Sequence, residues 1–82
     1  MEKRMALIGI VVENPEQSQQ VNELLHVYGQ YIVGRLGVPY RERGLSIISI
    51  IIDAPKDAIS ALSGKLGRIS GVQVKTMYTK EL

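Results

Sequence analysis

The sequence predicts an α+β fold of the ferredoxin-like βαββαβ type, a sandwich with a four-stranded antiparallel sheet and two helices on one face. Two observations predict it. Apolar segments with strand-like and helix-like periodicity follow one another in the order β-α-β-β-α-β. The first and third predicted strands are also apolar on both faces, whereas the second and fourth are not. Because this fold places its first and third strands in the centre of the sheet, pattern and topology agree.

The first third of the chain predicts a strand followed by a helix. Residues 5–12 are rich in Ile and Val and are too short a run for a stable helix. Asn14 is expected to cap the helix, Pro15 to occupy its first position and Gln17 to complete a capping box. Gly29 is expected to end the helix. Its buried stripe consists of Val21, Leu24, Leu25 and Tyr28.

The middle of the chain predicts an edge strand and a central strand. Residues 31–38 have an irregular pattern that contains Gly34 and Gly37. Pro39 cannot donate a hydrogen bond to a neighbouring strand, so we expect this strand at an edge. After a polar turn, residues 45–52 (LSIISIII) are apolar on both faces and are expected to be central.

The last third predicts a second helix and a second edge strand. The helix is expected to open at residues 53–55 and to end at Gly67 or Gly71. Its buried stripe consists of Ala58, Ile59, Leu62 and Leu66. Residues 72–79 alternate between inward and outward side chains, which is typical of a half-buried edge strand.

Size and composition favour self-association. The 82 residues correspond to one domain, expected to span residues 1–82. Small domains usually gain stability from disulfides, a metal or self-association. The chain contains no cysteine and a single histidine, His26, which excludes disulfides and thiolate metal sites. We therefore expect no metal and no cofactor, and a homo-oligomer, either a dimer or a tetramer.

The open face of the predicted sheet supports the same expectation. Both central strands carry aliphatic residues on both faces, so whichever set faces away from the helices forms an apolar patch. Such patches on soluble proteins normally mark interfaces. The alternative is a monomer with a slightly apolar sheet. RNA-recognition domains share the topology but stack bases on aromatic residues of the two central strands, where this sequence has none.

Charge and hydropathy exclude two further classes of partner. The formal net charge of +2 is too small to indicate nucleic-acid binding. No segment reaches the roughly 20 apolar residues of a membrane span. We expect a cytoplasmic protein that binds neither nucleic acid nor a membrane directly.

The residues supply no candidate for catalysis. Walker loops, GxGxxG motifs and Cys/His pairs are absent from the sequence, and no nucleophile has a neighbouring base. His26 lies away from the buried stripe of its helix and is expected to be exposed. The alternative interpretation is that His26 supplies half of the ligands of a metal site that is completed across an oligomer interface.

Two groups of residues are candidates for binding a small effector. Glu13 and Asn14 lie where the first strand meets the first helix, a place that attracts small anions, although a simple capping turn is the alternative. Arg35, Arg41 and Arg43 surround the second strand and could meet a carboxylate or phosphate. The alternative interpretation is that these arginines form a solvated rim that protects an edge strand. We take Glu13, Asn14, Arg35 and Arg41 as the candidate effector-binding residues.

The segment RLGVPYRERGLSIIS, residues 35–49, together with residues 50–55, resembles the signature region of the iron-only hydrogenase system regulator family. The first strand and the ENPE segment at residues 13–16 are also similar. The resemblance implies an ACT-like domain akin to the C-terminal domain of the nickel-responsive repressor. That domain binds metal and forms a tetramer core, while a separate ribbon-helix-helix domain binds DNA. Beyond His26, this sequence has no counterpart of the nickel ligands, and we expect no DNA-binding arm.

The resemblance also indicates where a ligand would bind. ACT domains bind small ligands, commonly amino acids, at subunit interfaces near the loop after the first strand, which is residues 13–15 here. The sequence thus favours a non-catalytic, oligomeric regulatory module of an iron-only hydrogenase system that senses a small ligand. Its partner would be a hydrogenase-system or DNA-binding protein. The alternatives are a protein–protein adaptor without a ligand and a small enzyme with interface-built catalysis.

Overall fold

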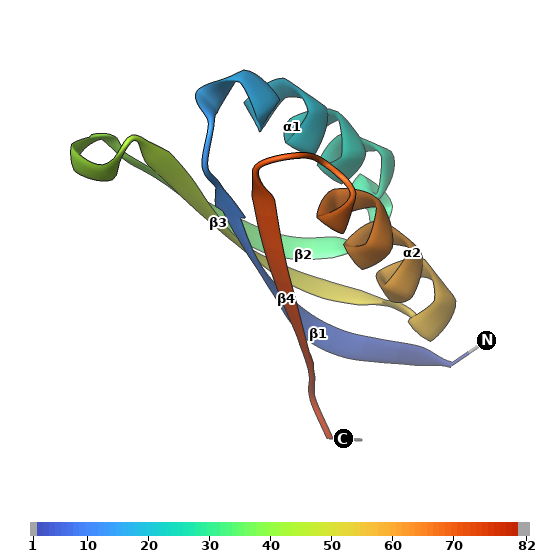
Figure 1. Cartoon of the computed structure of the whole chain (residues 1–82). Coiled ribbons are helices and arrows are strands. Elements are labelled where there is room, and N and C mark those ends of the chain that lie inside the picture. The colour runs from blue at the N-terminus through green and yellow to red at the C-terminus, as the bar shows by residue number, and fades with distance from the viewer. Residues whose placement is uncertain (1, 81–82) are drawn as a thin grey trace.

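The computed structural model describes residues 2–80 (Figure 1). The elements follow the predicted order: β1 (Lys3–Val12), α1 (Ser18–Val27), β2 (Ile32–Tyr40), β3 (Leu45–Pro55), α2 (Lys56–Gly67) and β4 (Val72–Tyr78). Three short 3-10 helices lie between them: η1 (Pro15–Gln17), η2 (Gly29–Tyr31) and η3 (Arg41–Arg43). The strands are a few residues longer than predicted at several ends.

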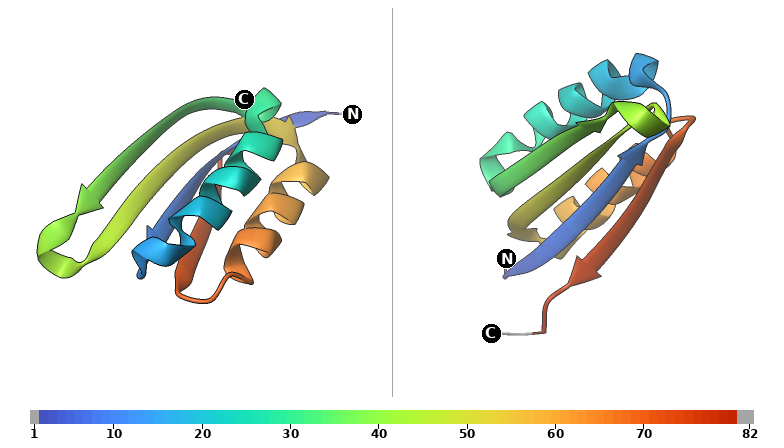
Figure 2. Two further views of the ribbon diagram at one scale, coloured as in Figure 1. Left: turned by 90° about the horizontal axis from the view of Figure 1, so that it is seen from above. Right: turned by 90° about the vertical axis from the view of Figure 1, so that its left-hand side faces the viewer.

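The strands form one antiparallel sheet in the order β2-β3-β1-β4. The prediction of a ferredoxin-like βαββαβ fold is confirmed, with β1 and β3 in the centre and β2 and β4 at the edges. Both helices lie side by side on one face of the sheet, as the two views of Figure 2 show. The opposite face carries no helix of the described chain.

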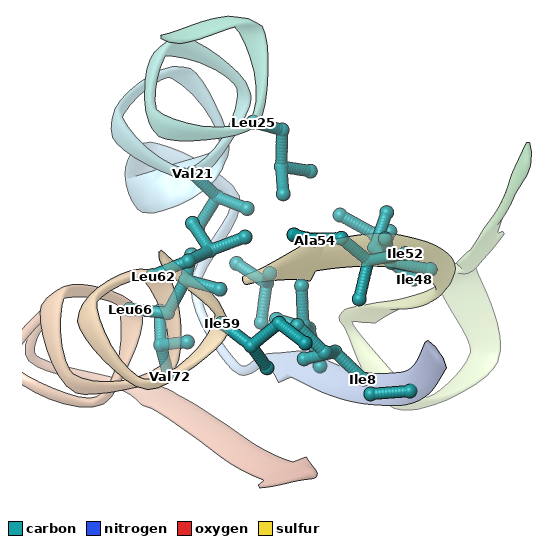
Figure 3. Packing of buried hydrophobic residues seen from close by; sticks show 14 residues of the cluster. Ile8, Val21, Leu25, Ile48, Ile52, Ala54, Ile59, Leu62, Leu66 and Val72 are labelled. Atoms are coloured by element: carbon teal, nitrogen blue, oxygen red, sulfur yellow. The ribbon is translucent and has the colours of Figure 1, made fainter. Parts of the chain in front are cut away.

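The core lies between the helices and the sheet, and alternation along the strands selects it. In β1 and β3 the even-numbered residues face the helices, and those within residues 6–12 and 48–54 are buried. The buried hydrophobic residues are Ala6, Ile8, Ile10, Val12, Val21, Leu25, Ile48, Ile50, Ile52, Ala54, Ile59, Leu62, Leu66 and Val72 (Figure 3). The helices contribute the stripes predicted for them, with Leu24, Tyr28 and Ala58 packed at the margin.

The start of the first helix differs from the prediction. Asn14 is a cap, because its Oδ1 accepts a hydrogen bond from the Glu16 N–H at 3.1 Å, but it caps η1 rather than α1. The capping box predicted at Gln17 is wrong. In the tight turn of η1 the Gln17 N–H bonds the Asn14 carbonyl at 3.0 Å. The Gln17 Oε1 is buried near Gly71, and no described residue bonds it.

Two other helix ends also differ. Gly29 follows the first helix, which ends at Val27 with Tyr28 as its C-cap, but it does not have the positive φ of a glycine cap. The chain instead tightens into η2, where the Tyr31 N–H bonds the Tyr28 carbonyl at 3.0 Å. The second helix begins at Lys56 instead of opening at residues 53–55. Those residues stay in β3 because β1 pairs with them up to Pro55, the partner of Lys3.

The hairpin of β2 and β3 extends beyond the helices. We call residues 38–47 the arm; it projects past the first turn of α1 in Figure 2. None of its residues is buried. At its tip η3 is closed by Gly44, whose φ of +65° lies in the left-handed region that favours glycine. The arm gives the molecule its length, with principal extents of 40 × 19 × 17 Å.

We expect Gly71→Ala to destabilise the protein more than Gly44→Ala. Both glycines have positive φ, which costs an alanine about 1–2 kcal/mol. A Cβ on Gly44 meets no atom within 4 Å, whereas one on Gly71 lies 3.3 Å from the buried Gln17 Oε1. Urea denaturation of both variants measures the difference. Equal losses would mean that Gln17 moves aside without cost.

Candidate functional site

The open face of the sheet carries seven of the nine exposed large hydrophobic side chains found among the described residues. In β1 and β3 the odd-numbered residues face away from the helices. The alternation in the sequence could not decide which of the two sets of residues faces outward, because both sets are apolar. Residues that are paired across neighbouring strands form rows perpendicular to the strands, and each row over residues 6–12 of β1 contains residues of β2, β3, β1 and β4. The exposed apolar side chains of the open face are Leu7, Leu36, Val38, Tyr40, Ile47, Ile51 and Met77.

Three rows cross the middle of the open face, and they are almost free of charge. One row joins Val38, Ile47, Val11 and Gln73; the next joins Leu36, Ser49, Gly9 and Lys75; the third joins Gly34, Ile51, Leu7 and Met77. Lys75 is the one charged side chain in these rows, and it lies on the edge strand β4. Ser49 and Gly9 are opposite each other, so the middle row has small side chains at its centre.

The structure does not bring the four predicted effector residues together. Glu13 follows β1, where its N–H bonds the Gly71 carbonyl at 2.8 Å and its Oε2 accepts from Gln73 Nε2 at 2.6 Å. Asn14 caps η1 next to it. Arg41 belongs to η3 at the tip of the arm. That these residues bind an effector stays a prediction.

Arg35 lies apart from the other three, on the helix-facing side of β2. One of its terminal N–H groups donates to Asn22 Oδ1 of α1 at 2.8 Å. Beside this contact is a groove of about 230 Å³, which we call the arm groove. It lies between Ser18 and Asn22 of α1 and the strand residues Arg35, Gly37, Pro39 and Ile48. Sequence reasoning missed the groove because it depends on the register between strands, for which the sequence carries no local signal.

Neither a metal site nor a membrane-spanning helix is found in the part of the chain that is described. Residues 2–80 contain no group of three or more His, Cys, Asp or Glu that could hold a metal ion. His26 is exposed on α1. No helix within residues 2–80 has the length and hydropathy needed to cross a membrane.

Comparison with known proteins decides the family. The sequence model of the TM1266-like family, described as "Iron-only hydrogenase system regulator, putative", matches residues 4–76. The chain belongs to this family. It is also similar in structure to the uncharacterized protein TM1266 from Thermotoga maritima, with a TM-score of 0.93 and 50% sequence identity. The match covers 96% of this chain and 100% of that one. The family resemblance of residues 35–55 is thereby confirmed. No curated protein matches the chain.

More distant structures share the fold of this TM1266-like protein. A formyltetrahydrofolate deformylase from Pseudomonas putida KT2440 matches with a TM-score of 0.64 and 13% identity, over 88% of this chain and 28% of that one. The divalent ion tolerance protein CutA1 from Ehrlichia chaffeensis matches with a TM-score of 0.52 and 13% identity, over 100% of this chain and 87% of that one. At these identities the similarity concerns the fold alone.

Proposed function

We propose that this TM1266-like protein is a non-catalytic regulatory module of an iron-only hydrogenase system, acting in the cytoplasm as a homo-oligomer. The whole chain, residues 1–82, would serve as one domain. Copies would contact each other through the open face of the sheet. The observation that carries the proposal is this face, whose aliphatic rows lie opposite the two helices and have no cover within the described chain.

The size of the open face suits a reversible dimer of two copies. The four strands, about 4.8 Å apart, are paired side by side over residues 6–12 of β1, and at about 3.3 Å per residue this gives a flat area of roughly 450 Å² per copy. Two such faces together give about 900 Å², close to the lower limit of about 1,000 Å² for a specific interface. We therefore expect self-association with micromolar rather than nanomolar affinity.

The chemistry of the face also suits a second copy. Interface cores are depleted in charged residues. The three central rows meet this condition, because their one charge, on Lys75, is at the edge strand where it can stay in water. Aliphatic rows match an identical aliphatic face, as a two-fold symmetric contact requires. No aromatic side chain stands in these rows to stack a base.

Sensing of a small ligand is the regulatory step we propose for the assembled module. The family description names a regulator, which supports a regulatory role in place of a catalytic one. A protein–protein adaptor without a ligand is the second candidate. The same open face favours it, since the face could contact a hydrogenase-system protein in place of a second copy. Purification of such a partner at fixed stoichiometry would support the adaptor.

A substitution that introduces a charge on the open face tests the proposed interface between copies. Ile51→Asp, at a residue 40% exposed, is expected to weaken self-association at least about 30-fold, since a central interface residue contributes about 2 kcal/mol or more. Light scattering over a range of protein concentrations measures this. Val27→Asp is the matched control, because Val27 is 69% exposed on α1, away from the face. A wild-type protein that stays monomeric at millimolar concentration would contradict the proposed interface.

A further inference from the structure

We propose that the arm groove binds a small carboxylate with a short branched aliphatic tail. The proposal deepens the ligand-sensing part of the proposed function and rests on it. It names a different place from the loop at residues 13–15 that the family resemblance indicates. It also names a ligand class, which follows from the residues that line the groove.

The strand register builds the floor and one wall of the groove. Arg35, Gly37 and Pro39 alternate along β2 on the helix-facing side, because their partners in β3 are Ile50, Ile48 and Ser46. Ile50 is fully buried. Ile48 retains 7% exposure and Ser46 is half-buried, so the floor opens toward the arm.

The first helix supplies the other wall. Ser18 and Asn22 are four residues apart, and residues at this spacing lie on the same side of a helix. Both line the groove opposite the β2 residues. The arm extends past this end of α1, and no helix covers it there (Figure 2). The groove is therefore open to solvent at the end nearest the arm.

Arg35 makes the groove attractive to an anion. It is the one charged side chain among the residues that line the groove. Its bond to Asn22 Oδ1 occupies one of five N–H donors and leaves others for a ligand. The same bond fixes the amide of Asn22, so that its NH₂ group remains a donor. The hydroxyls of Ser18 and Ser46 can also donate, so the groove offers the hydrogen-bond donors that a carboxylate requires.

The apolar part of the groove selects the tail. Ile48 and Pro39 offer aliphatic surface next to these donors. Gly37 leaves room above the floor, because a Cβ at this position would meet no atom within 4 Å. The volume of about 230 Å³ lies below the range of about 300–1,000 Å³ usual for larger ligands. No carboxylate lines the groove to pair with an ammonium, so an amino acid fits less well than a carboxylate without one.

Isovalerate is a suitable probe, with the full chain labelled with ¹⁵N for NMR. We expect saturable shifts of the amide signals of Asn22, Gly37 and Ile48 on titration at constant ionic strength. Arg35→Gln is expected to weaken binding at least about tenfold, because it removes the charge-assisted donors. Gly37→Val is expected to abolish binding by filling the groove. Gly64→Val is the control, since Gly64 is exposed on α2, lines neither the arm groove nor the open face, and also has free space around it.

Valine and inorganic phosphate complete the experiment. Valine has the same tail but carries an ammonium, and we expect it to bind at least about tenfold more weakly than isovalerate. Equal binding of valine would overturn the proposal. So would phosphate binding in the absence of isovalerate binding, because the apolar floor would then play no part. Isovalerate binding that persists unchanged in both Arg35→Gln and Gly37→Val would also overturn it.

Light scattering on the same samples separates this proposal from the proposed interface. Isovalerate binding by a monomer would leave the groove proposal standing and contradict the oligomer. An oligomer that shows no groove shifts would contradict the groove proposal alone.

Discussion

Ile50→Asp is expected to leave most of the protein unfolded. Ile50 is fully buried in the central strand β3, between the sheet and the helices. Truncating such a side chain costs about 2–5 kcal/mol, and a carboxylate without a partner there costs more. Natural domains are stable by only about 5–15 kcal/mol. Circular dichroism and urea denaturation would measure the loss.

The neighbouring residue provides the control for this prediction. Ile51 is the next residue of β3 but faces away from the helices. Ile51→Asp should keep the folded circular dichroism spectrum and lose only the self-association described above. If Ile50→Asp stayed folded with native stability, the assignment of the two faces of β3 would be wrong.

Leu62→Ala is expected to lower the free energy of unfolding by about 2–5 kcal/mol. Leu62 is fully buried on α2, and Figure 3 shows it between the helices and the sheet. Removing its branched end leaves a cavity that the surrounding strands and helices close only in part. Chemical denaturation followed by circular dichroism gives the value.

Val27→Ala is the comparison for Leu62→Ala. Val27 is 69% exposed in the last turn of α1, so its truncation should change stability by no more than about 0.5 kcal/mol. A loss at Val27 as large as that at Leu62 would mean that an unseen contact, such as a second copy, covers this helix.

The sequence predicted the fold because its local patterns agree with one another. Residues 5–12 and 45–52 are apolar on both faces, and both became central strands. Pro39 marked an edge strand correctly. Patterns of this kind reflect burial along a whole strand. The position of a strand in the sheet is therefore predicted correctly even when its first or last residue is not.

Features that depend on a single long-range contact could not be predicted. Gln17 has the spacing of a capping box, yet its side chain lies near Gly71, more than fifty residues further along the chain. The strand before α2 continued to Pro55 because β1 pairs with it to the end. The arm groove likewise requires the register of β2 on β3, which contains an irregularity between Ile32 and Gly34.

The arm gives β3 two ends that should exchange amide hydrogens at different rates. From Ile48 onward β3 runs through the core, where an amide opens only when most of the domain unfolds. Residues 45–47 belong to the arm, where none of them is buried and the pairing with β1 ends at Ser46, so their hydrogen bonds can open locally. A single strand therefore reports on both global and local opening. If a second copy covers the open face, the exchange of residues 45–47 should slow as the protein concentration rises, while that of the core residues changes much less.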